Sequence, residues 1–191
     1  MNARIVGITL IAAFLIGSFQ LATAGVAHVI LAFCYIGILI AGLGFLLDRP
    51  QLIYAYCAIA LIAQVPFSVD LVRIYFGYEQ LIGLVTYDPL SHSLFGRIVD
   101  FGVHVFVLPF VLFSLRYVEP VRMPSFVRWY VPLLVVGLGV SLVADVNCAR
   151  IGCFEPLAYG MTAWGHYAYL SIIVIFGPLL AAWGLWRIHD R

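Results

Sequence analysis

Residues 68–104 read SVDLVRIYFGYEQLIGLVTYDPLSHSLFGRIVDFGVH and join two long apolar runs of the chain. Asp70 and Arg73 end the first run, and Arg97 and Asp100 lie at the start of the second. Each pair is spaced i, i+3 and therefore shares one face of a helix. A single loop on one side of a membrane makes the two helices antiparallel, which brings the pairs to a similar level. Because charges inside a membrane are costly and usually face the bundle interior, we expect a four-charge cluster.

The composition around this stretch is that of a membrane protein. Of 191 residues, 64% are hydrophobic and 10% are charged, whereas soluble domains carry about a quarter charged residues. The net charge of +1 and the absence of a basic run argue against a nucleic-acid partner. All ten basic residues are arginines, so Schiff-base chemistry on a lysine is excluded.

Six runs are long and apolar enough to cross the hydrocarbon core, which needs about 20 residues. The sequence therefore predicts an all-α, polytopic transmembrane helical bundle with one domain, residues 1–191. The predicted spans cover about residues 5–22, 26–47, 51–72, 94–117, 129–146 and 163–186.

The arginines predict the orientation of the bundle. With six crossings both termini lie on one side, and seven of the ten arginines fall on that side. By the positive-inside rule both termini are expected in the cytoplasm and the protein in the inner or plasma membrane. Arg73, Arg97 and Arg150 fall on the opposite, extracytoplasmic side.

The first 24 residues have two interpretations. Arg4, an apolar run and the sequence Ala22-Thr23-Ala24 resemble a secretory signal peptide with its cleavage site. The run is long for such a peptide and continues at once into another apolar run, which favours a first transmembrane helix. The topology of the remaining chain is the same under both interpretations.

The last extracytoplasmic loop adds polar residues to the side on which the central stretch ends. Asp145 and Arg150 lie in it, as do Cys148 and Cys153. Thiols on that side of a membrane are usually oxidised, so a structural Cys148–Cys153 disulfide is expected. Their C-x4-C spacing lacks the CxxC pattern of redox-active pairs.

The histidines are the candidates for chemistry or for a cofactor. Asp100 and His104 are spaced i, i+4 on one helix face, and a carboxylate in that place can orient an imidazole general base. Asp100, His104 and His166, with His92 above them, could surround a metal, but no HxxxH or HExxH motif is present, so no metal site is predicted. His28 and His166 at similar depth leave a bis-imidazole haem open, and the cofactor stays unknown.

Three functional hypotheses follow. The first is a polar site near the extracytoplasmic leaflet that binds or processes a lipid or a small anionic or amphipathic ligand, with Asp100 and His104 as the catalytic pair if the protein is an enzyme. The second is an accessory or structural subunit of a larger membrane complex, with other membrane subunits as partners. A haem- or metal-binding redox protein is a lesser alternative. The expected ligand-binding residues are Asp70, Arg73, Arg97, Asp145, Arg150 and His166.

Overall fold

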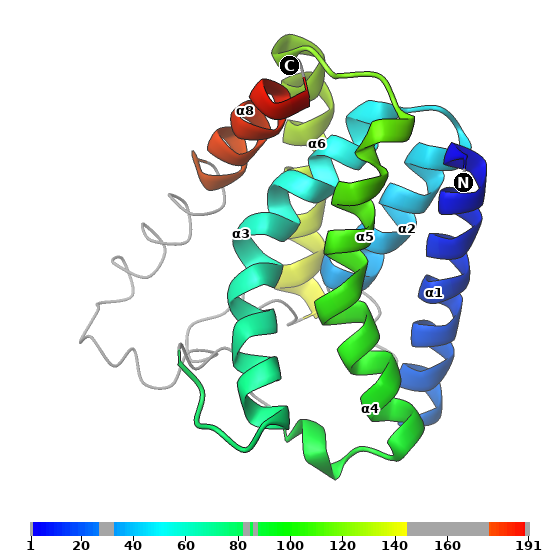
Figure 1. The fold of residues 1–191 in the computed structure, drawn as a ribbon, viewed down its shortest axis with the longest axis vertical. Helices are drawn as coiled ribbons and strands as arrows, with labels where there is room; N and C mark the ends of the chain where they lie inside the picture. The colour runs from blue at the N-terminus through cyan, green and yellow to red at the C-terminus, as the bar shows by residue number, and fades with distance from the viewer. Residues whose placement is uncertain (1, 27–32, 82–84, 86–87, 145–175, 190–191) are drawn as a thin grey trace.

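The computed structural model describes residues 2–26, 33–81, 85, 88–144 and 176–189. This part of the chain consists of helices and connecting turns and contains no strand, which confirms the all-helical class there (Figure 1). The elements in chain order are α1 (Ala3–Thr23), α2 (Phe33–Leu46), α3 (Pro50–Tyr75), η2 (Pro89–Ser91), α4 (Leu94–Phe101), the π-helical turn η3 (Gly102–Phe106), α5 (Val107–Ser114), η4 (Leu115–Tyr117), α6 (Met123–Ala144) and α8 (Gly177–His189).

Two of the described helices are long and apolar enough to cross a membrane. They are α1 and the continuous helix Leu94–Tyr117, whose bounds coincide with the predicted span 94–117. The two halves of α3 make a third candidate if they count as one bent span, and Cys34–Leu46 is a shorter apolar helix. The described part therefore supports a membrane protein with two or three apolar spans.

Helix α3 is the centre of the bundle. It packs against α2, α5, α6 and α8, and every residue from Ile53 to Ala60 is buried. A helical segment that is buried all round, as residues 53–60 are, belongs in the middle of an assembly of helices. Tyr54 and Tyr56 are among the largest fully buried side chains of the core, together with Phe45 of α2 and Tyr130 of α6.

The two helices that frame the site are both distorted. The halves of α3, Pro50–Leu61 and Gln64–Tyr75, meet at an angle of 52°. Pro66 lies inside this helix, and its ring and missing N–H disturb the preceding turn. The helix Leu94–Tyr117 widens into a π-helical turn at Gly102–Phe106, shortly before Pro109. Pro109 has no N–H group and cannot donate to the carbonyl of Val105, four residues earlier. The regular α-helical bond is therefore missing at this turn.

Helix α3 continues three residues past the predicted end at Val72 and stops at a glycine. Gly77 has a φ of 77°, a conformation that an L side chain rarely adopts. The amide of Tyr78 donates to the carbonyl of Arg73 at 2.9 Å, and the amide of Gly77 donates to that of Ile74 at 3.0 Å. These two bonds form a Schellman motif, which turns the chain into the loop before α4.

Helix α6 begins at Met123, earlier than the predicted start at Trp129. The predicted start is too late because Pro124 is as typical of a loop as of a helix start. A proline is compatible with the first turn of a helix, where its missing N–H leaves no bond unmade. The amide of Phe126 accordingly donates to the carbonyl of Arg122 at 3.0 Å.

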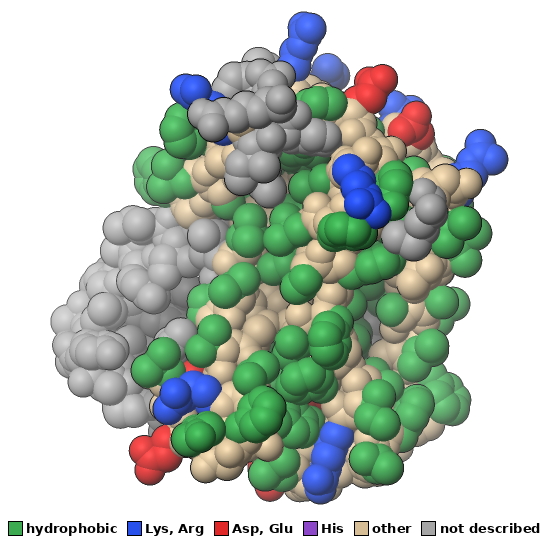
Figure 2. Space-filling model, in the orientation of Figure 1, with side chains coloured by type: hydrophobic (Ala, Val, Ile, Leu, Met, Phe, Trp, Pro, Cys, Tyr) green, Lys and Arg blue, Asp and Glu red, His purple; other side chains and the backbone are tan. Residues whose placement is uncertain are grey.

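The charged side chains are concentrated toward the two ends of the long axis of the molecule. On the face shown in Figure 2 the blue and red side chains gather toward the two ends, and green hydrophobic side chains fill the middle. The start of α1, the α2–α3 turn, the start of α6 and the end of α8 lie at one end (Figure 1). The α3–α4 loop lies at the other end.

Candidate functional site

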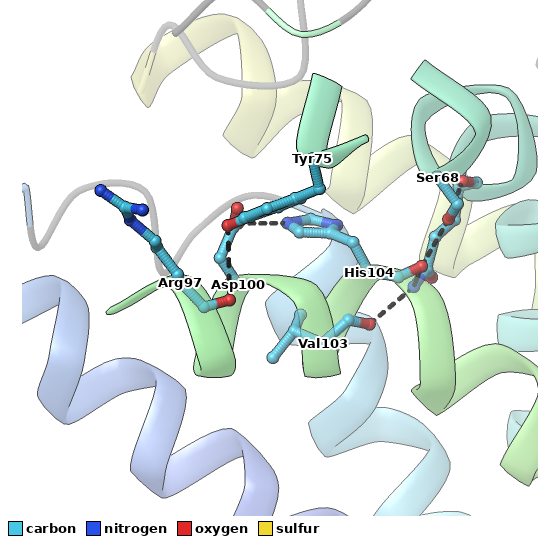
Figure 3. Close-up of polar contacts among 7 residues, drawn as sticks. Ser68, Tyr75, Arg97, Asp100, Val103 and His104 are labelled. Atoms are coloured by element: carbon cyan, nitrogen blue, oxygen red, sulfur yellow. Dashed lines mark hydrogen bonds and ion pairs between the residues drawn. The ribbon is translucent and has the colours of Figure 1, made fainter. Parts of the chain in front are cut away.

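The π-helical turn leaves two backbone carbonyls to be satisfied by another helix. The side-chain amide of Gln64 donates to the carbonyl oxygens of Val103 at 2.8 Å and of His104 at 3.0 Å. Ser68 Oγ also lies within hydrogen-bond distance of the His104 carbonyl (Figure 3). Tyr56 donates its hydroxyl hydrogen to Gln64 Oε1 at 3.2 Å. Polar side chains of α3 therefore stabilise the irregular turn of the neighbouring helix by binding its carbonyls.

Asp100 and His104 form a buried pair next to this turn. His104 Nε2 lies 3.5 Å from Asp100 Oδ1, and both side chains are buried (Figure 3). Two aromatic rings flank the imidazole: that of Phe67 at 4.6 Å between centroids and that of Tyr35 at 6.1 Å, edge-on. A carboxylate beside one ring nitrogen orients the imidazole and favours the tautomer that carries a proton there. The i, i+4 prediction for these two residues thus corresponds to a close contact.

Tyr75 extends this polar group toward the loop end. Its hydroxyl donates to the carbonyl of Arg97 at 3.4 Å, and its ring meets Phe101 edge-on at 5.3 Å. Figure 3 shows the Tyr75 side chain reaching from the end of α3 toward Asp100. The last turn of α3 is thereby fixed against the first turns of α4.

The arginines and Asp70 hold the loop between α3 and α4. Arg73 Nε donates to the carbonyl of Glu79 at 2.7 Å, and the completely buried Asp70 accepts the amide of Leu81 at 2.7 Å. Arg97 donates from Nε to the carbonyl of His92 at 2.9 Å and from Nη2 to that of Leu90. Each side chain therefore organises loop backbone, a role that the expected four-charge cluster did not include.

A groove of about 470 Å³ runs between α3 and the helix that contains the π-helical turn. Its polar lining consists of Ser68, Arg73 and His104, and the remaining lining is apolar. Two of its valines are well exposed, Val65 at 42% and Val69 at 39%, so the groove is open along its side. The lining residues are Leu61, Val65, Ser68, Val69, Val72, Arg73, Leu81, His104, Val105, Leu108, Pro109 and Leu112.

Several predicted site residues lie outside the part of the chain that the structure describes. They are Asp145, Arg150, His166, His28 and the predicted disulfide pair Cys148–Cys153. The described cysteines, Cys34 of α2 and Cys57 of α3, are free thiols. Within the ranges that the structure describes, no group of three or more His, Cys, Asp or Glu side chains is placed to hold a metal ion.

Gln64 and Ser68 are site residues that the sequence did not predict. A signal was present, because the two polar residues are spaced i, i+4 within the apolar run of α3 and so share one face. Their target was not readable, since it is a pair of backbone carbonyls on another helix. The groove was missed for the same reason, because it exists only where two distorted helices separate.

Comparison of the chain with protein-family models, with curated proteins and with solved structures gives no match.

Proposed function

We propose that this protein is a multi-pass membrane protein that binds a membrane lipid in the groove between α3 and α5. The main observation in support is the lining of the groove, which is apolar along most of its length and polar at Ser68, His104 and Arg73. Ligand sites typically combine an apolar wall with a few polar groups that fix orientation, and a volume of about 300–1,000 Å³ is usual. The exposure of Val65 and Val69 gives an acyl chain access from the side.

The proposed topology is the six-span arrangement with both termini in the cytoplasm. The placement of the α1 start, the α2–α3 turn and the end of α8 at one end supports it (Figure 1). The positions of the arginines agree, because Arg4, Arg49, Arg116 and Arg187 belong to helix ends and turns of that end. The α3–α4 loop and the end of the groove near it then face the extracytoplasmic leaflet.

The test uses lipids with a photoactivatable group on the acyl chain. The purified protein in lipid nanodiscs is irradiated, and labelled peptides are identified by mass spectrometry. We expect labels on the groove positions Val65, Val69 and Leu108. Val69→Trp fills the groove and should reduce this labelling to background.

A matched control makes the experiment decisive. Val135 of α6 is 64% exposed and does not line the groove, so Val135→Trp should leave groove labelling unchanged. Labelling spread evenly over the exposed faces of α1 and α6, with no effect of Val69→Trp, would contradict the proposal.

A role as an accessory subunit is the second candidate function. It is favoured by the use of Arg73, Arg97 and Asp70 to hold backbone within the chain itself. Asp100→Ala separates the two functions. If the protein binds or processes a lipid, the Asp100→Ala variant should stay folded and lose this function. If the role is purely structural, the variant should lose folding. A thermal melt in mild detergent measures whether the variant is folded.

A further inference from the structure

The groove has one cationic side chain in its lining, and this side chain has unused donors. Arg73 carries five N–H groups. In the described contacts only the N–H on Nε is used, and it donates to the carbonyl of Glu79. Its guanidinium carbon lies 5.7 Å from the centre of the Tyr78 ring, within the range of a cation–π contact. Within the described residues the two terminal nitrogens of Arg73 have no hydrogen-bond partner.

Arg97 shows the contrast. Both Nε and Nη2 of this residue are bonded to loop carbonyls, those of His92 and Leu90. It is not part of the groove lining. Of the two described arginines at the loop end, Arg73 is therefore the one that lines the groove, and it has four unused N–H groups against three for Arg97.

The position of Arg73 fits the head of a membrane lipid. The groove runs along α3 from Leu61 to Arg73. In the half of α3 beyond the bend, the nine helical rises from Gln64 to Arg73 span about 14 Å. One leaflet contributes about half of a hydrocarbon core that is about 30 Å thick. The apolar part of the groove thus matches the depth of one leaflet, with the guanidinium group at its headgroup level.

We infer that the groove selects an anionic phospholipid, with one acyl chain in the groove and its phosphate bound by the terminal nitrogens of Arg73. The inference rests on the proposed lipid-binding function. A guanidinium fork binds two oxygens of a phosphate side by side, which suits a fixed headgroup position. The open side of the groove leaves room in the bilayer for the second acyl chain.

The test compares lipids that differ only in the headgroup. Nanodiscs of phosphatidylcholine receive a trace of photoactivatable phosphatidylglycerol, phosphatidylcholine or free fatty acid, each with the same reactive acyl chain. We expect phosphatidylglycerol to label the groove roughly fivefold more than phosphatidylcholine, as for one arginine acting on an anionic headgroup. Arg73→Gln should reduce the phosphatidylglycerol signal to the phosphatidylcholine level.

Two further variants show whether the preference depends on the guanidinium group at position 73. Arg73→Lys keeps the charge without the fork and should give an intermediate preference for phosphatidylglycerol. Arg116→Gln removes an arginine at the opposite end, where its guanidinium lies 3.7 Å from the centre of the Phe113 ring, and should leave the preference intact. Equal thermal melts of all variants show that folding is unaffected, and a melt lowered by Arg73→Gln leaves Arg73→Lys as the deciding variant.

The outcomes separate this inference from the proposed function. Equal groove labelling by phosphatidylglycerol and phosphatidylcholine, unchanged in Arg73→Gln, overturns the headgroup inference and leaves lipid binding standing. Groove labelling by the fatty acid alone shows a carboxylate ligand and also overturns the phospholipid assignment. The absence of groove labelling with every probe overturns both.

Discussion

Gln64 donates its side-chain amide to the backbone carbonyl of Val103 at 2.8 Å, across the interface between α3 and the π-helical turn. This bond, with its companion to the carbonyl of His104, places the polar centre of the bundle between two irregular helices. If this helix spans a membrane, as proposed, its irregular backbone is tolerated there because side chains of a neighbouring helix satisfy it.

Gln64→Leu should therefore lower the stability of the bundle. The substitution keeps the size of the side chain but leaves the carbonyls of Val103 and His104 without the amide. We expect a loss of about 1–2 kcal/mol, the upper range for hydrogen bonds between transmembrane helices, measured by unfolding in mixed detergent. Gln51→Leu is the control, because Gln51 makes a 3.3 Å bond to Ser125 at a half-buried site, and its effect should be smaller. Equal losses would show that the π-helical turn does not depend on Gln64.

Asp70→Ala should loosen the loop after α3. The buried carboxylate accepts the amide of Leu81 at 2.7 Å, and alanine cannot replace this acceptor. Hydrogen–deuterium exchange at Leu81 is expected to become faster, while Asp70→Asn, which keeps an acceptor oxygen, should restore part of the protection. Asp88→Ala removes an exposed acceptor of the Leu90 amide and should leave exchange at Leu81 unaltered. Slow exchange at Leu81 in Asp70→Ala would disprove the anchoring role.

Gly7→Ala should separate α1 from α2. A Cβ atom at Gly7 would lie 2.8 Å from the carbonyl oxygen of Gly42 and 2.9 Å from the amide nitrogen of Leu46. Both atoms are backbone, so the helices must move apart, at a cost of about 1–3 kcal/mol. Gly184 of α8 has nothing within 4 Å of the corresponding position, so Gly184→Ala should leave the melting temperature unchanged or slightly higher. A melting temperature unaffected by Gly7→Ala would refute close α1–α2 packing.

The proposed orientation predicts opposite labelling of two acidic positions. Glu79 of the α3–α4 loop and Glu119 of the connection before α6 are both exposed. In a background without the four native cysteines, Glu79→Cys should react with a membrane-impermeant maleimide in intact cells. Glu119→Cys should react only after the membrane is permeabilised. The reverse pattern would invert the topology, and reaction of both positions in intact cells would contradict a spanning segment between them.

The sequence was sufficient for helices whose limits depend on hydropathy and local signals. The helix Leu94–Tyr117 was predicted with its observed bounds, because the apolar run covers its whole length. The structure adds the cap at its start, where Ser93 Oγ accepts the amide of Gly96. The contact between Asp100 and His104 followed from their i, i+4 spacing. In both cases the decisive residues are neighbours along the chain.

Features that depend on two separate segments were not predictable. Arg73 was expected in a four-charge cluster with Asp70, Arg97 and Asp100. The sequence did not predict the bond from its Nε to the carbonyl of Glu79, whose position follows from the left-handed turn at Gly77. Similarly, the carbonyls of the π-helical turn accept hydrogen bonds from Gln64 and Ser68 of α3. Hydropathy carries no information about where a loop carbonyl points, so such contacts emerge only with the fold.

The open side of the groove determines how the proposed lipid would arrive and how the occupancy of the groove must be expressed. Val65 and Val69 form its exposed edge within the apolar band of the molecule, so the proposed lipid would enter by lateral diffusion within one leaflet, without passing through water. The relevant concentration is then the mole fraction of that lipid among its neighbours. Detergent molecules compete for the same surface, so dilution with micelles should empty the groove even when the total lipid per volume is unchanged.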